Sequence, residues 1–380
     1  MKSILQKDLW SITSFLENKN YKFNKENILT QLPEKFIDEA IKAISSWDNY
    51  APTPLVKLNK LNDELKFKNI YYKDEDKRFD LKSFKALGGA FAVYKIASEK
   101  ENITVSTATA GNHGRSVAWG AQRLGLKCKI FISEFVSESR AEAMRKLGAE
   151  VIRVKGNYDN SLKECIKQSK ENNWEIVQDV SWEGYKEVPK LIMAGYTIMI
   201  KEILDEVKSN SISHVFLQAG VGGMAAAMIA GFAKLSQNIP KFIIVEPENA
   251  DCVFQSIKNN KPTSVDIKKE TVMGGMSCGD VSSIAWEILK NSSNYCLTIS
   301  DEAISTTVAL LAEKRLSDEK IIAGECAVPG IIALISSFNN KEYLDKLELN
   351  EQSNVLLFGC EGLTDSAMYQ KLLSDGLQKI

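Results

Sequence analysis

One lysine of this 380-residue chain lies in a segment that is otherwise small and apolar. The segment reads Ser83-Phe84-Lys85-Ala86-Leu87-Gly88-Gly89-Ala90. Burial lowers the pKa of a lysine, and its neutral amine then becomes a usable nucleophile. Taken alone, however, the segment is explained more simply by an exposed lysine on an amphipathic helix, because an unpaired ammonium is costly to bury.

A second segment combines glycine, amide and imidazole groups just after a strand-like run. It reads Thr109-Ala110-Gly111-Asn112-His113-Gly114-Arg115. A glycine before a helix start presents backbone N–H groups to an anion, and the Asn112 amide adds a side-chain donor. A tight turn that binds no ligand fits this segment equally well.

The third segment is a glycine loop between a strand-like run and an apolar helical run. It reads Gln218-Ala219-Gly220-Val221-Gly222-Gly223-Met224-Ala225. Glycines let the backbone approach a phosphate, and a helix N-terminus supplies positive potential. The loop also fits a loose dinucleotide pattern, with Glu246 at the end of the next strand, so an NAD-binding dehydrogenase is a competing hypothesis. That hypothesis leaves the Lys85 and Asn112 segments without a purpose.

The elements that would position these segments alternate along the chain. Short, continuous, β-branched runs predict strands buried on both faces of a parallel sheet. They lie near residues 70–72, 103–106, 129–132, 151–154, 176–178, 215–217, 242–245 and 355–358. Helical periodicity separates them, for example over 113–124 and 137–146, so the chain is predicted to be an α/β protein. The first fifty residues are predicted to be helical or irregular, without an assigned role.

Composition limits the classes of partner. The formal net charge is −1, which argues against nucleic acid or an anionic membrane as a partner. Two histidines are too few for a histidine-rich metal site, and we expect no metal. Seven scattered cysteines and a start without an apolar signal core indicate a cytoplasmic location. The uncharged stretch 215–233 is interrupted by glycines, which favours a buried strand, turn and helix over a membrane span.

Together the three segments resemble the fold type II pyridoxal-phosphate (PLP) enzymes, the tryptophan-synthase β-like family. The resemblance implies two domains, each a twisted, mostly parallel sheet flanked by helices, with the cofactor in the cleft between them. The large domain would comprise 1–90 and 195–380, and the inserted α/β domain 91–194. A homodimer and a small amino-acid substrate are further family expectations.

The resemblance also assigns roles to single residues. Lys85 would hold PLP covalently, and Asn112 would bond the phenolic oxygen of the cofactor. The substrate carboxylate would be received by the loop of Thr109, Ala110, Gly111 and His113. The phosphate would be bound by Gly220, Val221, Gly222, Gly223 and Met224. Cys360 follows the last predicted strand, where this family places a small polar residue against the pyridine nitrogen; a buried core cysteine is the alternative.

A narrower resemblance points to the diaminopropionate ammonia-lyase family. It rests on Arg78–Gly89, Val177–Tyr185, Val245–Pro247, Met273–Gly279, Ile322–Glu325 and Glu361–Asp365. It implies loss of the β-amino group of 2,3-diaminopropionate to give pyruvate and two ammonia, with Lys85 and Asp179 catalytic. Asp179 is the candidate proton donor or orienting group, although a capping or salt-bridging aspartate is the alternative.

Two positions depart from that family. Ala110 replaces an aspartate proposed as a base, which predicts a preference for the L-isomer. The run Gly324–Gly330 also differs from the usual sequence at a helix start. Ala110 favours an L-serine or L-threonine dehydratase as an alternative, whereas Asp179 and the 273–279 run oppose it. A β-replacement synthase and an inactive binding protein on the same fold are the remaining alternatives.

Overall fold

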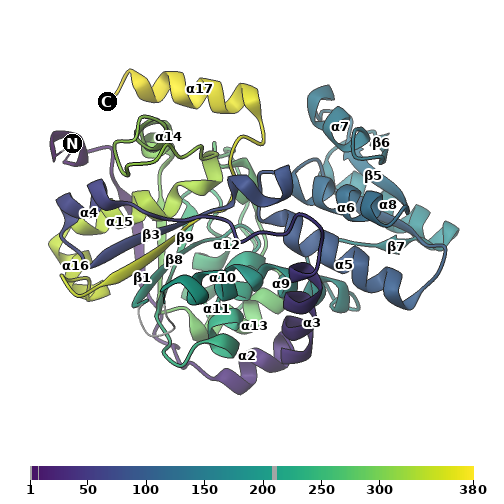
Figure 1. Ribbon diagram of the computed structural model, residues 1–380, viewed down its shortest axis with the longest axis horizontal. Helices are drawn as coiled ribbons and strands as arrows, with labels where there is room; N and C mark the ends of the chain where they lie inside the picture. The colour runs from purple at the N-terminus through teal and green to yellow at the C-terminus, as the bar shows by residue number, and fades with distance from the viewer. Residues whose placement is uncertain (1, 7, 208–211) are drawn as a thin grey trace. The chain divides into compact units, whose positions relative to one another are not determined.

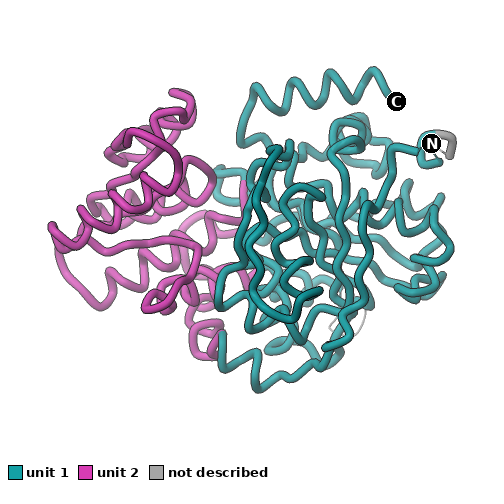
Figure 2. Tube along the Cα trace, turned by 180° about the vertical axis from the view of Figure 1, so that it is seen from behind, with its two compact units in different colours: residues 1–31, 52–82, 199–380 teal, residues 32–51, 83–198 magenta. Residues whose placement is uncertain are grey.

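The computed structural model describes residues 2–6, 8–207 and 212–380, and the chain divides into two compact units. Unit 1 comprises residues 1–31, 52–82 and 199–380, and unit 2 comprises 32–51 and 83–198 (Figure 2). Residues 32–51, 83–90 and 195–198, which the predicted boundaries gave to the large domain, thus fall in unit 2. The reason is local packing, because α3 (Glu34–Ser45) contacts both α5 (Lys85–Glu99) and α9 (Glu187–Tyr196).

Unit 1 contains a seven-stranded sheet in the order β1-β10-β9-β8-β11-β3-β2 (Figure 1). Its edge strands pair antiparallel with their neighbours, and the other pairs are parallel. The strands are β1 (Ile12–Glu17), β2 (Leu55–Lys57), β3 (Asn69–Asp74), β8 (His214–Gln218), β9 (Lys241–Pro247), β10 (Tyr295–Ile299) and β11 (Asn354–Gly359). Strands β8 and β11 are buried along their whole length, as expected where helices cover both faces of a sheet.

Helices α11 and α15 are apolar on nearly every side and are buried in unit 1. Helix α15 lies across five strands of the sheet, and α11 packs on β8, α2 and α13; α14 packs against α17 (Figure 1). The helices here are α1 (Lys2–Leu5), α2 (Lys25–Gln31), α4 (Asn59–Leu65), α11 (Gly223–Leu235), α12 (Cys252–Lys258), α13 (Ser283–Ser292), α14 (Ile304–Ala312), α15 (Pro329–Asn339), α16 (Lys341–Leu347) and α17 (Ser366–Leu377). Four short 3₁₀ turns join them at η1 (Glu75–Asp80), η2 (Gly274–Met276), η3 (Asp301–Ala303) and η4 (Glu325–Ala327).

Unit 2 is built on a four-stranded parallel sheet in the order β6-β5-β4-β7. Its strands are β4 (Thr104–Ala108), β5 (Lys127–Ser133), β6 (Glu150–Val154) and β7 (Glu175–Ile176). The remaining helices are α6 (Asn112–Arg123), α7 (Glu138–Arg145) and α8 (Tyr158–Asn172), and α10 (Ile198–Val207) begins at the unit boundary. Helix α8 contacts all four strands and closes a core around Ala108, Phe131 and Cys165.

The predicted α/β class, both predicted helices and seven of the eight predicted strands are confirmed; of the strand predicted at 176–178, only Ile176 belongs to a strand, the two-residue β7. The apolar stretch 215–233 is a strand, a glycine turn and a helix, as predicted. Among the described residues, no helix combines the length and the apolar character that crossing a membrane would require. Strands β1, β2 and β10 were not predicted, and β1 alternates irregularly between exposed and half-buried positions.

Candidate active site

Lys85 begins helix α5 and faces an acidic side chain of the same unit. Its Nζ donates a hydrogen bond to Oδ2 of Asp179, and the two side chains are 27% and 14% exposed. Lys85 is therefore neither the exposed surface lysine of the simpler interpretation nor a buried ion without a counter-charge. No spacing rule in the sequence joins positions 85 and 179, but the structure brings them together.

The segment that precedes Lys85 is anchored by a buried ionic cluster in unit 1. The Arg78 guanidinium donates to Glu75 and Glu202 at 2.8 Å, and Nζ of Lys73 lies 2.6 Å from a Glu202 oxygen. All four side chains are nearly inaccessible to water. Removing one partner from such a cluster leaves a buried charge without its counter-charge. The cluster therefore fixes this part of the chain. This structural role explains why Arg78 occurs in the run that carries the family resemblance without assigning it a role in the chemistry.

Asp179 lies just beyond β7 and is held by the backbone around it. The Tyr185 hydroxyl donates to the Ile176 carbonyl at 2.8 Å and accepts from the Gln178 N–H at 2.9 Å. The ring of Tyr185 stacks on Trp182 at 4.2 Å. Tyr185 thereby ties the end of β7 to the following turn and positions the neighbouring Asp179.

The electrostatics favour an ionised Asp179. Burial acts to raise its pKa, but the positive charges of His113 and Lys85, with the Lys85 hydrogen bond, lower the pKa below its ordinary value. An ionised carboxylate accepts protons and does not donate them. A proton that Asp179 delivers to a leaving group must therefore be one that it has first received.

His113 is buried behind Asp179. Its Nε2–H donates to the Val177 carbonyl at 2.8 Å, while Nδ1 lies 3.8 Å from Oδ2 of Asp179. Burial lowers the pKa of His113, while the charge of Asp179 opposes that shift. The His113 side chain therefore supports the Asp179 segment. If the 109–113 loop binds a substrate carboxylate, it does so through its backbone N–H groups.

The 109–112 loop leads from β4 into α6 and is partly exposed. Its Gly111 N–H donates to Oγ1 of Thr109 at 3.3 Å. A Cβ added to Gly111 would meet no heavy atom within 4 Å, so the loop faces open space. Ala110 and Asn112 are half-buried here. That an anion binds at this helix start stays a prediction.

In unit 1, the glycine loop joins β8 to α11. Gly222 has φ +87°, and a Cβ there would lie 2.9 Å from Cδ1 of Leu289. A Cβ on Gly220 would lie 3.0 Å from Sγ of Cys278, whereas one on Gly223 would meet nothing within 4 Å. Gly220 and Gly222 thus permit local packing, and Gly223 faces the space where a phosphate can approach the N–H groups of the first turn of α11. The loop fits a PLP phosphate.

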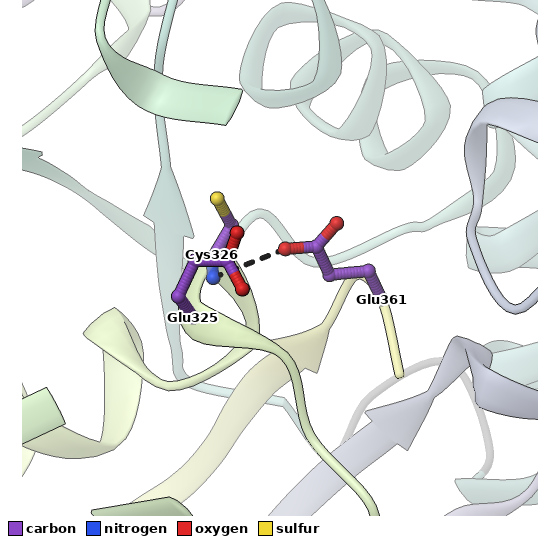
Figure 3. A group of neighbouring side chains, drawn as sticks. All are labelled: Glu325, Cys326 and Glu361. Atoms are coloured by element: carbon purple, nitrogen blue, oxygen red, sulfur yellow. Dashed lines mark hydrogen bonds between the residues drawn. The ribbon is translucent and has the colours of Figure 1, made fainter. Parts of the chain in front are cut away.

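Cys360 lies just after β11 and is buried. Its Sγ donates to the Cys326 carbonyl at 3.1 Å. Two acidic side chains lie close by, since Glu361 accepts from the Cys326 N–H at 3.2 Å and Glu325 completes the group in Figure 3. The potential metal-ligand atoms of Glu325, Cys326 and Glu361 lie within 4.8 Å of one another. Burial raises the pKa of the Cys326 thiol well above its ordinary value, and a neutral thiol is a poor metal ligand.

The predicted site residues divide between the two units. Lys85, Asp179 and His113 meet in unit 2, and the 109–112 loop lies in the same unit. The glycine loop and Cys360 belong to unit 1. Tyr185 ends the resemblance run Val177–Tyr185 but was given no role, and Tyr196 was not predicted, because nothing near it in the sequence distinguishes it from a core residue.

Three comparisons place the chain among known proteins. A model of the family described as pyridoxal-phosphate dependent enzyme matches residues 47–361. Diaminopropionate ammonia-lyase of Escherichia coli (strain K12) is 34% identical over 352 residues, which cover 86% of this chain and 88% of that protein. A crystal structure of the Escherichia coli enzyme with an aminoacrylate-PLP azomethine intermediate has a TM-score of 0.88 at 32% identity, covering 97% and 99% of the two chains. Threonine deaminase isoform 2 from Solanum lycopersicum shares the fold, with a TM-score of 0.80 at 21% identity, covering 96% and 92%.

Proposed function

The chain belongs to the family of pyridoxal-phosphate-dependent enzymes, alongside the diaminopropionate ammonia-lyases, and we propose that it eliminates the β-amino group of 2,3-diaminopropionate. The observation that carries the proposal is the Lys85–Asp179 pair within unit 2. The pair supplies a nucleophilic amine and a carboxylate that can shuttle a proton. Relatives of the chain, among them the Escherichia coli protein, are named for this reaction.

Bound PLP draws electrons from Cα of an amino acid and so makes the Cα proton removable. Lys85 would hold it through Nζ, Asn112 would bond its phenolic oxygen, and the loop of Gly220–Met224 would bind its phosphate. Cys360 would face its pyridine nitrogen, where a thiol would be a weak hydrogen-bond partner.

The remaining roles belong to the protein alone. The 109–113 loop holds the substrate carboxylate and fixes the direction of the Cα–H bond. Nζ of Lys85 accepts the Cα proton and passes it through their hydrogen bond to Asp179, which delivers it to the β-nitrogen. The Cβ–N bond breaks and ammonia leaves. The 2-aminoacrylate product takes up one water to give pyruvate and the second ammonia.

Two alternatives fare differently. In a dinucleotide site Glu246 would bind ribose, but it is fully buried and accepts the N–H groups of Val253 and Phe254 at 2.9 and 2.7 Å. It caps α12 instead, which removes the support for a dehydrogenase. A serine or threonine dehydratase remains the second candidate, because Ala110 gives the loop the form found in those enzymes. A cytoplasmic location and a homodimer stay predictions.

The deciding experiment measures end-point pyruvate and ammonia with L- and D-2,3-diaminopropionate, L-serine and L-threonine. We expect two ammonia per pyruvate from the L-diamine and little product from the other three. Lys85→Ala should abolish cofactor absorbance and turnover, while Lys77→Ala, at an exposed lysine in the same region, should leave both unchanged. One ammonia per pyruvate from L-serine, with no reaction of either diamine, would overturn the proposal in favour of the dehydratase.

A further inference from the structure

Tyr196, the last residue of α9, lies against the start of α5. Its ring packs edge-on to Phe84 with the centroids 4.7 Å apart. Nζ of Lys85 lies 5.5 Å from the centroid of the same Phe84 ring. The Tyr196 ring and the Lys85 amine are thus neighbours of one aromatic side chain within unit 2.

Two glycines allow this approach. A Cβ on Gly88 would lie 2.4 Å from Cε1 of Tyr196, and a Cβ on Gly195 would lie 2.7 Å from the Leu87 carbonyl oxygen. Neither distance is compatible with a side chain, so the two helices could not pack this closely with larger residues. Gly88 in α5 and Gly195 in α9 therefore allow the Tyr196 ring to lie against the first turn of α5, which begins at Lys85.

The Tyr196 hydroxyl is fully enclosed. The residue is 2% exposed, and its oxygen makes no well-aligned hydrogen bond to any residue that the structure describes. Burial raises the pKa of this phenol, the charge of Lys85 and a hydrogen-bonding interaction with its amine oppose that rise, and the charge of Asp179 adds to it. The hydroxyl therefore stays protonated and interacts electrostatically with both members of the pair. A buried hydroxyl without a strong hydrogen-bond partner costs free energy, so a nearby group that can turn toward the Tyr196 hydroxyl would stabilise it.

We propose that the Tyr196 hydroxyl is a positioning group for Lys85, which interacts with the Lys85 amine beside Asp179 and becomes its main hydrogen-bond partner when Asp179 turns to the substrate. This role rests on the proposed function, in which Lys85 must be free of Asp179 while Asp179 serves the leaving nitrogen. Since the phenol keeps its proton, it holds the amine in place and carries no proton itself. Tyr196 acts through the Lys85 amine and transfers no proton.

The first test uses the full-length protein stripped of cofactor, so that it does not depend on turnover. Lys85 is acetylated with acetic anhydride over a pH series, and the modified peptide is quantified by mass spectrometry. Because a hydroxyl that accepts from the ammonium favours the charged form, Tyr196→Phe should shift the labelling midpoint down by about one pH unit. Tyr94→Phe, at a partly exposed tyrosine on the same helix as Lys85, should leave the midpoint unchanged.

The second test follows the PLP-loaded enzyme. The pH profile of kcat for Tyr196→Phe should move in the same direction as the labelling midpoint, with KM nearly constant. The variant keeps the ring contacts, and its thermal midpoint against Tyr94→Phe checks that it is folded. An unshifted labelling midpoint in a folded Tyr196→Phe protein would overturn the role of Tyr196. Absence of diaminopropionate turnover in the parent protein would instead refute the proposed function, and the labelling result would remain readable.

Discussion

Oδ2 of Asp179 accepts a hydrogen bond from Nζ of Lys85, which joins a residue at the start of α5 to one just beyond β7. The pair keeps both groups charged in a partly buried place. Each charge compensates the other, and separating them exposes a carboxylate with a lowered pKa to the substrate. The first prediction follows from that carboxylate.

Asp179→Asn should slow elimination of an amine more than elimination of a better leaving group. Ammonia leaves only when a proton reaches its nitrogen, and a positioned acid contributes roughly 10²–10⁴-fold. Chloride leaves β-chloroalanine without that proton. Comparison of kcat on 2,3-diaminopropionate and β-chloroalanine measures the difference. Equal slowing of both substrates would leave Asp179 with an orienting role only.

The glycine loop permits a matched pair of substitutions. Gly223→Val should weaken PLP binding by roughly tenfold or more with the fold intact, because its side chain enters the open space before the α11 amides. Gly222→Ala should instead lower the thermal midpoint, since φ is +87° and Leu289 is close; a left-handed residue with a Cβ costs about 1–2 kcal/mol. Cofactor titration and thermal melting separate the two. If Gly223→Val retained PLP as tightly as the parent, the loop would not bind the phosphate.

The buried carboxyl of Glu246 gives a pH-dependent term in stability. Burial raises its pKa from 4.5 to about 8, although the N–H groups of Val253 and Phe254 act in the opposite direction. The folded state therefore holds this proton to higher pH than the unfolded state. Its contribution is complete below about pH 4.5 and is lost as pH rises through about 8, by at most about 1.4 kcal/mol per pH unit.

Glu246→Gln removes this titration. Urea unfolding at pH 5, 6.5 and 8 should show a smaller loss of unfolding free energy with rising pH in the variant than in the parent. Matching slopes for the two proteins would mean that Glu246 is ionised in the folded state across this range.

The sequence was most informative where burial is continuous. Strands β8, β9 and β11 are runs of apolar residues, so their type and place were predictable. The short edge strand β2 and the irregular β1 carry no such pattern, because pairing with a neighbour and not their own composition makes them strands. Strand β10 carries an apolar signal like that of β9, although no strand was predicted there.

The site was predictable to a different degree at each residue. The residue type of Gly222 and Gly223 alone predicts a turn and an open helix start. Asp179 was found only through family resemblance, because no local rule connects it to Lys85. Tyr196 could not be found, since its place depends on the close approach of α5 and α9 at Gly88 and Gly195. Such helix packing is a long-range property.

The last prediction concerns Ala110. The two enantiomers of 2,3-diaminopropionate, held by the same carboxylate and amine contacts, direct their Cα hydrogens to opposite sides. Lys85 can accept a proton on one side only, so turnover of both isomers needs a second base. The resemblance places an aspartate at this position, whereas the methyl group of Ala110 cannot accept a proton. We therefore expect turnover of the L-isomer and little or none of the D-isomer.

Ala110→Asp should gain turnover of the D-isomer, because position 110 lies in the partly exposed loop that has room for a carboxylate beside Gly111. Ala110→Asn is the matched control, since it adds the same bulk without a base and should gain nothing. Pyruvate formation from each isomer, followed separately for the three proteins, checks this. Comparable rates on both isomers by the parent protein would mean that another group serves the second side, and position 110 would then have no part in the choice of isomer.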